Sequence, residues 1–334
     1  MIFKRKLKDF SSFDNKDIIF ENAEVILTRR CNLKCGHCMR GQSQNIDMSE
    51  DVMDSILDKV TEFGNLCIGG GELTSVPKIV EVFVDKAIKK SVRIKSVNLT
   101  TNGIVFSQEL AETLLKLKDY VEECRENPWG FDMSEEKPVM LRVSLDDFHL
   151  MEMERLGVSF EKVLDNIKKY QEILGEDCVR ASYGCDYDVL REGRAKNIST
   201  DVHISKQYLP KHLYYMESNK SVVISPVITI GATGEVIPLN IAFDREKVLS
   251  FGNIKNEKLS AIMQRFKMAK VEDSESLYRK TFSYMKKIST KQRTIKRYSK
   301  SKRFNKRLAV ETILQTRGQS LKEDYENFTF EQEK

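Results

Sequence analysis

Short apolar runs alternate with amphipathic segments over the first half of the chain, and this alternation limits the possible folds more than any other feature. The apolar runs have the length of buried strands, and the amphipathic segments carry apolar residues at helical spacing. Such a pattern is typical of β/α units built around a parallel sheet, an α/β fold. The expected strands are 23–28, 65–72, 94–103, 139–147 and 178–186, and the expected helices are 48–63, 76–90, 107–121 and 160–174. The expected N-caps are Ser49, Ser107 and Ser159.

The pattern changes after about residue 220. Residues 221–239 hold two β-rich runs around a Gly-containing turn, which predicts a small C-terminal β-hairpin module. The charge also divides along the chain. Residues 265–334 contain 19 Lys and Arg against 9 Asp and Glu, whereas the rest of the chain is mildly acidic. We therefore expect an acidic body followed by a basic helical tail.

Composition narrows the class of protein. With 334 residues and 40% apolar residues, the chain can bury a large core, and 31% charged residues keep it soluble. No run approaches the roughly 18 apolar residues of a transmembrane helix, and the basic start leads into polar residues rather than into a signal peptide. Seven cysteines are an odd number for a disulfide framework. A reducing cytoplasm is therefore expected, where clustered cysteines serve metals or redox chemistry.

Three cysteines and a histidine fall within "CNLKCGHC", directly after the first expected strand. They are Cys31, Cys35, His37 and Cys38. Three thiolates and an imidazole could close a zinc site, but structural zinc sites usually pair their ligands in two knuckles, and the other cysteines are scattered. The ring of His37 would also have to fold back sharply to share a metal with Cys38. Three thiolates alone would hold an iron–sulfur cluster with one iron left open.

The C-x3-C-x2-C spacing resembles the motif of radical S-adenosylmethionine (radical SAM) enzymes. The resemblance implies that Cys31, Cys35 and Cys38 bind one [4Fe–4S] cluster and that S-adenosyl-L-methionine (SAM) chelates its open iron. An electron from the reduced cluster would then cleave SAM and leave a 5′-deoxyadenosyl radical. The implied architecture is a partial (β/α)6 TIM-type barrel, open on one side for a substrate.

Further strand-end motifs follow in the order of that family. "GGGEL" resembles a Gly-Gly-Glu motif that binds the SAM amino group, although Leu73 replaces the proline that often follows it. "TTNG" resembles a stretch along the ribose and methionine, and "SLDD" begins with a serine that resembles a ribose-binding residue. Arg155, eleven positions after Ser144, would bind the SAM carboxylate, and "GRA" at 193–195 would lie near the adenine of SAM. The implied SAM-binding residues are Gly70, Gly71, Glu72, Thr101, Asn102, Ser144, Arg155 and Arg194.

Asp146 and His149 follow the fourth expected strand, near the implied radical site. A carboxylate and an imidazole placed there are candidates for proton transfer or substrate contact, and we predict that they are catalytic. A solvated loop is the competing interpretation.

The C-terminal module resembles the start of the SPASM or twitch region of peptide-modifying radical SAM enzymes, which has a Gly-x-Val turn and then Gly-Asn-Ile. That region binds auxiliary clusters through cysteines, but no cysteine follows Cys185, and Pro238 and Leu239 stand where a ligand is expected. We predict a degenerate twitch-like hairpin without an auxiliary cluster. An ordinary hairpin of other origin is the alternative.

These observations divide the chain into four segments: an N-terminal extension at 1–20, a radical SAM core at 21–215, the twitch-like module at 216–265 and the basic tail at 266–334. The module favours a peptide or protein substrate. The alternative is a nucleic acid or nucleotide, because residues 286–307 hold eleven basic residues and no acidic one. A zinc-stabilised nucleic-acid-binding protein is the rival from another class. A flavodoxin or ferredoxin is the expected electron donor, and no membrane partner is expected.

Overall fold

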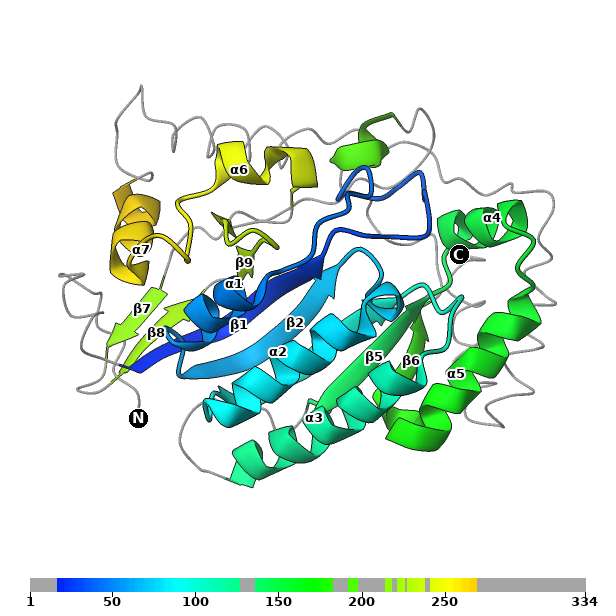
Figure 1. The fold of residues 1–334 in the computed structure, drawn as a ribbon, viewed down its shortest axis with the longest axis horizontal. Coiled ribbons are helices and arrows are strands. Elements are labelled where there is room, and N and C mark those ends of the chain that lie inside the picture. The colour runs from blue at the N-terminus through cyan, green and yellow to red at the C-terminus, as the bar shows by residue number, and fades with distance from the viewer. Residues whose placement is uncertain are drawn as a thin grey trace, which may run out of the picture. The chain divides into compact units, whose positions relative to one another are not determined.

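Five parallel strands, adjacent in chain order, form the centre of the fold (Figure 1). They are β1 (Asp17–Thr28), β2 (Glu62–Gly70), β4 (Val97–Thr101), β5 (Val139–Ser144) and β6 (Val179–Ser182). The short β3 (Arg93–Ile94) pairs with the start of β2. The sheet is not closed, since β6 forms one end of the described strand order. The predicted α/β class with a partial, open barrel is confirmed.

The structure is a computed structural model that describes residues 17–126, 136–182, 192–197, 214–217, 221–225, 227–237 and 241–268. All of these residues belong to one compact unit, Met1–Arg297. The predicted basic tail begins at residue 266, and all of it after residue 268 lies outside the described residues. A second unit, Tyr298–Lys334, falls within this part. Cys185, Pro238 and Leu239 lie outside them as well.

Four helices lie on one face of the sheet (Figure 1). They are α1 (Glu50–Leu57), α2 (Pro77–Lys89), α3 (Gln108–Glu126) and α5 (Phe160–Leu174). Two predicted caps are confirmed: the Ser107 hydroxyl accepts the N–H of Leu110, and the Ser159 hydroxyl accepts the N–H of Lys162. Ser49 stands at the N-cap of α1, but its side chain makes no capping bond.

The predicted helix over 48–63 is too long. It ends at Leu57, and Phe63 lies in β2 with its ring centroid 6.0 Å from that of Phe20. Phe63 is fully buried, so the sheet core outweighs the helical spacing that this residue shares with α1. Strand β1 also begins earlier than predicted, at Asp17, because its buried apolar residues start at Ile18 and pair with β8.

The predicted C-terminal hairpin forms, but it continues the same sheet. β8 (Ser221–Ser225) runs parallel to the first part of β1, and β9 (Ile228–Ile230) runs parallel to the later part. β10 (Val236–Ile237) pairs antiparallel to β9 across a turn with Gly234 at φ +93°, and β7 (Tyr214–Glu217) pairs with β8. The segment ends with α6 (Glu246–Leu249) and α7 (Leu259–Met268). The division of the chain at residue 215 stays a prediction.

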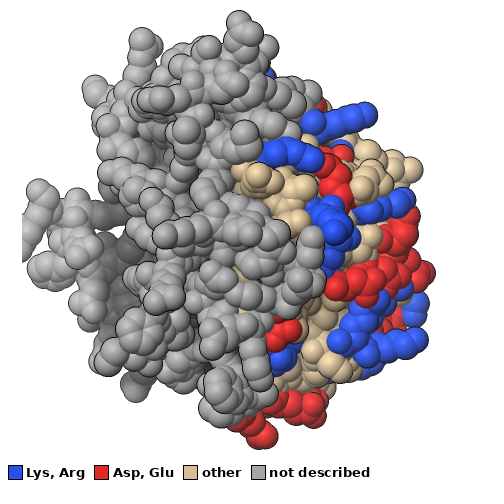
Figure 2. Space-filling model, turned by 90° about the vertical axis from the view of Figure 1, so that its left-hand side faces the viewer, with Lys and Arg blue, Asp and Glu red and all other residues tan. Residues whose placement is uncertain are grey.

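Charged side chains of both signs are mixed over the described part of one face (Figure 2). Ion pairs of this kind join Lys86 to Asp54 and Lys255 to Asp51. The described part of this face therefore offers no wholly basic surface, and the basic run at 286–307 lies outside the described residues. None of the described helices combines the length and the apolar character that crossing a membrane requires.

Candidate functional site

The loop that follows β1, residues 29–44 (the cysteine loop), carries Cys31, Cys35 and Cys38. Its two ends pair with each other: the Gln44 N–H donates to the Arg29 carbonyl at 2.9 Å, and the Arg29 N–H donates to the Ile46 carbonyl at 2.8 Å. The loop is thus closed at its base and leaves the carboxyl end of β1, where ligands of open α/β folds bind. The sequence-predicted position of the three cysteines at a strand end is confirmed.

The three thiols differ in exposure. Cys35 is buried, whereas Cys31 and Cys38 are partly exposed. Burial raises the pKa of the Cys31 thiol to about 11, and burial, followed by the charge of Asp146, raises the pKa of Cys35 further. A bound cation would favour the thiolate forms of Cys31 and Cys35 over the protonated forms.

Arg194 holds the backbone of the cysteine loop. It lies on a short 3-10 helix, Gly193–Asn197, and its side chain donates to the carbonyls of Cys35, at 2.8 Å, and Gly41. Its own N–H donates to the Cys38 carbonyl at 3.0 Å. Gly193 has φ +56°, and a Cβ there would lie 2.4 Å from a loop carbonyl, so glycine is required for this close approach. The predicted contact of Arg194 with adenine stays a prediction.

Helix α4 (Asp147–Arg155) contacts the other side of the loop. The Lys34 N–H donates to a Glu152 carboxylate oxygen at 2.8 Å, and the Arg155 guanidinium donates to the same carboxylate at 3.0 Å. The hydrogen bond from Arg155 lowers the pKa of Glu152. Arg155 thus reaches the cysteine loop through Glu152, with half of its side chain exposed. Its predicted role toward the SAM carboxylate stays a prediction.

Gly70 and Gly71 let the end of β2 approach the cysteine loop. A Cβ at Gly70 would lie 2.0 Å from the Thr28 carbonyl oxygen, and one at Gly71 would lie 1.8 Å from the Arg30 carbonyl oxygen. The Gly71 N–H donates to the Thr28 carbonyl at 2.8 Å, and the Glu72 N–H donates to the Arg30 carbonyl at 2.7 Å. The resemblance implies that these glycines bind SAM, and in the structure the space beside them is filled by the backbone of Thr28 and Arg30.

The buried carboxylate of Glu72 joins the ends of β2 and β4. It accepts the Thr101 hydroxyl at 2.6 Å and the Asn102 N–H at 2.8 Å, besides the N–H and hydroxyl of Thr74. The Asn102 side chain then donates to Asn32 in the cysteine loop at 2.7 Å. The structure therefore brings Glu72, Thr101 and Asn102 together with the cysteine loop. Ser144 lies half-buried at the end of β5, one strand further.

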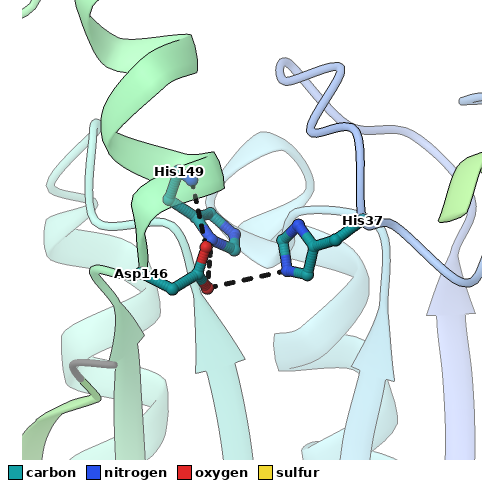
Figure 3. A group of neighbouring side chains, drawn as sticks. All are labelled: His37, Asp146 and His149. Carbon is teal, nitrogen blue, oxygen red and sulfur yellow. Dashed lines mark hydrogen bonds and ion pairs between the residues drawn. The ribbon is translucent and has the colours of Figure 1, made fainter. Parts of the chain in front are cut away.

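His37 of the cysteine loop converges with Asp146 and His149 (Figure 3). His149 Nδ1 lies 2.7 Å from Asp146 Oδ2, and His37 Nε2 lies 3.6 Å from the same oxygen. Their ligand atoms lie within 4.8 Å of one another, and among the described residues these three form the only such group of His, Cys, Asp and Glu. The arrangement can hold a proton between a carboxylate and two imidazoles, and it has the donor types that a divalent cation uses.

Asp146 is the N-cap of α4, which sequence reasoning missed. Its carboxylate accepts the N–H of Phe148 at 3.0 Å and that of His149 at 3.2 Å. Burial opposes its charge, but the hydrogen bond and charge of His149 outweigh burial and hold its pKa below the ordinary value. Asp146 is thus a buried carboxylate that orients the His149 ring, and the competing interpretation of a solvated loop is wrong.

The ring of His37 packs against α4. It stacks on Phe148 with centroids 4.6 Å apart and an interplanar angle of 19°. Burial lowers the pKa of His37 to about 4, so the ring is neutral. Its Nδ1 is buried without a hydrogen-bond partner. Nothing in the sequence indicated this stacking, since Phe148 lies on a helix that was not predicted.

Three thiols on a strand-end loop, closed against a Gly-Gly-Glu strand end, form the arrangement that the sequence motif implies. The family profile described as "Radical SAM superfamily" matches residues 25–184, a range that contains the cysteine loop, Gly70–Glu72 and the whole of α4. Over residues 25–184, a little less than half of the chain, this protein is thus similar to the radical SAM superfamily. Arg194 and the C-terminal strands lie beyond the matched range.

Curated relatives match part of the chain. A probable GTP 3′,8-cyclase of Methanococcus maripaludis (strain C6) is 32% identical over 157 residues, which is 44% of each chain. A GTP 3′,8-cyclase of Clostridium perfringens (strain 13) is 32% identical over 156 residues, 44% of this chain and 42% of the relative. The chain thus spans less than half the length of the curated relatives it matches.

Two solved structures resemble the chain weakly. The structure of anSMEcpe with bound AdoMet and Cp18Cys peptide covers 82% of this chain and 97% of its own, with 13% identity and a TM-score of 0.44. SuiB of Streptococcus suis, bound to the precursor peptide SuiA, covers 87% of this chain and 77% of its own, with 13% identity and a TM-score of 0.37.

Proposed function

We propose that this chain is a radical SAM enzyme that binds one [4Fe–4S] cluster through Cys31, Cys35 and Cys38 and binds SAM beside it. The observation that supports this most strongly is the closure of the three-thiol loop against Gly70 and Gly71 at the end of β2. Both parts lie within the family match. The same proposal includes the other SAM-binding residues that the resemblance implies: Glu72, Thr101, Asn102, Ser144, Arg155 and Arg194.

The donor set suits a cluster better than a single zinc ion. A tetrahedral zinc ion would draw its thiolates to within about 4 Å of one another. The three thiols do not form such a group, because the group of donors within 4.8 Å is His37, Asp146 and His149. The fourth donor of the zinc alternative, His37, is turned toward Phe148. This geometry favours the enzyme over the zinc-stabilised nucleic-acid-binding protein.

When bound, the cluster and SAM would supply a 5′-deoxyadenosyl radical that removes hydrogen from a substrate. The chain's own residues prepare that site. Arg194 and Glu152 fix the backbone of the cysteine loop, and Glu72 fixes the ends of β2 and β4. The burial of Cys35 keeps water from its sulfur. These contacts place the binding groups before any ligand arrives, which lowers the ordering cost of binding.

Asp146 and His149 form the acid–base pair of the proposed site. Asp146 accepts a hydrogen bond from His149 Nδ1, and this bond leaves Nε2 as the ring nitrogen that can take up a proton. A proton released by the substrate would thus pass to His149, whose positive charge the Asp146 carboxylate stabilises.

A peptide or protein is the proposed substrate class. The two motifs behind the twitch resemblance lie side by side: the Val236 N–H donates to the Gly252 carbonyl at 2.9 Å, and the Ile254 N–H donates to the Gly234 carbonyl at 2.8 Å. The Asn253 side chain donates to the Thr233 carbonyl at 2.7 Å and closes the turn. This pairing supports twitch-like ancestry over an unrelated hairpin.

A nucleotide is the second candidate substrate, because the curated relatives are named GTP 3′,8-cyclases. The region after residue 184, where the family match ends, would then select the substrate. A polynucleotide substrate would depend on the basic run at 286–307. In either case we place the protein in the cytoplasm with a flavodoxin or ferredoxin as electron donor, and the described cysteines are free thiols as that compartment requires.

Substrate-dependent SAM cleavage tests these candidates. The reconstituted protein is incubated with SAM and dithionite, alone, with GTP, with RNA or with short peptides encoded near its gene. A several-fold rise in 5′-deoxyadenosine with one peptide, and none with GTP or RNA, is the expected result. A rise with GTP and consumption of GTP would replace the peptide proposal by the nucleotide one.

A further inference from the structure

Two buried arginines flank the three cysteines, and one aromatic ring contacts both. Arg29 precedes Cys31 by two residues, and Arg40 follows Cys38 by two. The guanidinium carbons of Arg29 and Arg40 lie 5.4 and 6.0 Å from the centroid of Phe243, within the range of cation–π attraction. Phe243 comes from the segment after β10 and is itself buried. A residue far along the chain thus contacts both ends of the cysteine-bearing segment.

Glu246 pairs with Arg29. Its carboxylate, which has no exposed surface, accepts a hydrogen bond from Arg29 Nη2 at 2.6 Å. Gly231 leaves room for this carboxylate, since a Cβ at Gly231 would lie 2.6 Å from Glu246 Oε2. Glu235 lies 3.9 Å from the same guanidinium. The charge next to the cysteine loop is therefore balanced by the C-terminal segment rather than by solvent.

Arg40 is held through its backbone and its side chain. The Phe243 N–H donates to the Arg40 carbonyl at 3.0 Å, and Arg40 Nη1 donates to the Ile241 carbonyl at 3.2 Å. Its other nitrogen, Nη2, donates to Glu24 on β1 at 2.5 Å. Together with the Arg29 contacts, these bonds fix both arms of the cysteine loop against residues 241–246.

We propose that Phe243 and Glu246 are positioning residues for the cysteine loop, and that Glu246 also sets the electrostatic environment of the metal group bound there. Without the ring, the two guanidinium groups lose their shared contact and the loop gains freedom. Without the Glu246 charge, Arg29, which precedes Cys31 by two residues, keeps only its longer ion pair with Glu235 among the two carboxylates that face it. The positioning role rests on geometry, whereas the electrostatic role rests on the proposed function.

Thiol alkylation in the metal-free full chain tests the positioning role. The variants are Phe243→Leu and Glu246→Gln, and iodoacetamide labelling of Cys35 is followed by peptide mass spectrometry. Both variants are expected to raise the Cys35 labelling rate several-fold. Asp244→Asn is the matched control, because it removes one charge from an exposed neighbour and is expected to leave the rate unchanged.

Cys124, buried in α3, reports global unfolding in the same digest. Unchanged labelling of Cys35 in both variants would overturn the positioning role. An equal rise at Cys35 and Cys124 would overturn it as well, because the change would then not be local to the loop.

A redox titration of the reconstituted protein above about pH 8, where the Glu246 carboxyl is ionised, followed by electron paramagnetic resonance, tests the electrostatic role. A less fully compensated Arg29 charge favours the more negative, reduced cluster. Glu246→Gln is therefore expected to shift the midpoint potential to a more positive value, and Asp244→Asn to leave it unchanged. Equal potentials in wild type and Glu246→Gln would overturn this role. Failure of the wild type to bind iron would count against the proposed function. The result of the alkylation test would still hold, because that test uses the metal-free chain.

Discussion

The Glu72 carboxylate accepts the backbone N–H of Asn102 at 2.8 Å, and through this bond the loops that follow β2 and β4 share one buried anion. The Thr101 hydroxyl and the Thr74 N–H donate to the same side chain. A buried carboxylate is stable only when donors surround it, and here its own chain supplies them. Glu72 is therefore a structural centre of the site before it meets any ligand.

Replacing this anion should destabilise the fold. Glu72→Ala leaves several buried donors unpaired, so we expect the free energy of unfolding in urea to fall by about 3 kcal/mol. Glu50→Ala, at an exposed carboxylate on α1, is the control and should change it by less than about 0.5 kcal/mol. Equal effects of the two substitutions would contradict the role assigned to Glu72.

A methyl group at Gly71 should disturb the cysteine loop, because it would lie 1.8 Å from the Arg30 carbonyl oxygen. We expect Gly71→Ala to lower stability by about 2 kcal/mol, with a matching fall in Tm measured by calorimetry. Gly36→Ala adds the same group within the loop at an ordinary 3.7 Å contact with Phe148 and should be tolerated. A Gly71→Ala protein with the Tm of the wild type would show that the close approach is not required.

Glu246 should make stability fall as pH rises. Burial raises the pKa of its carboxyl to about 7, although Arg29 opposes the shift. In the unfolded chain the Glu246 carboxyl has the ordinary pKa of a glutamate. Between that pKa and the raised pKa of the folded protein, the folded state therefore binds more protons than the unfolded state. The stability that this proton contributes is present at low pH and is lost as pH rises toward 7.

Comparison with Glu246→Gln isolates this effect, because glutamine does not titrate. We expect the stability of the wild type relative to Glu246→Gln to decrease by about 2 kcal/mol between about pH 5 and pH 8, from urea unfolding at each pH. A relative stability that increases over this range would show that the Arg29 pair outweighs burial.

Asp146 should act as a helix cap. Asp146→Ala removes the acceptor of the Phe148 and His149 N–H groups, and a loss of about 1 kcal/mol in urea unfolding is expected. Asp146→Asn keeps an acceptor oxygen and should lose less. Alanine and asparagine variants of equal stability would argue against the cap.

The sequence was sufficient to predict the β/α units and the place of the cysteine loop at a strand end, because both depend on local pattern. Apolar runs mark the buried strands, and parallel strands bring their carboxyl ends to one edge, so Asn32 of the cysteine loop, Glu72 and Asn102 meet without further information. Phe63 was misplaced because its helical spacing from Ile56 is coincidental and the sheet buries it.

Long-range partners could not be predicted. The contacts of Arg29 and Arg40 with Phe243 join segments far apart in the chain, and an isolated arginine looks the same in sequence whether it is solvated or buried. The same limit applies to His37, whose partner Phe148 belongs to a helix that lacks strong apolar periodicity. A sequence motif identifies Arg194 as a candidate SAM-binding residue, but its hydrogen bond to the Cys35 carbonyl in the cysteine loop is visible only in the structure.

Formation of 5′-deoxyadenosine tests the central claim most directly. The chain is reconstituted with iron and sulfide without oxygen, and SAM is added with dithionite. The account predicts about four irons per chain and dithionite-dependent 5′-deoxyadenosine, both lost when Cys31, Cys35 and Cys38 are replaced by alanine. Stoichiometric zinc without iron uptake, or SAM cleavage that survives the triple substitution, would contradict it.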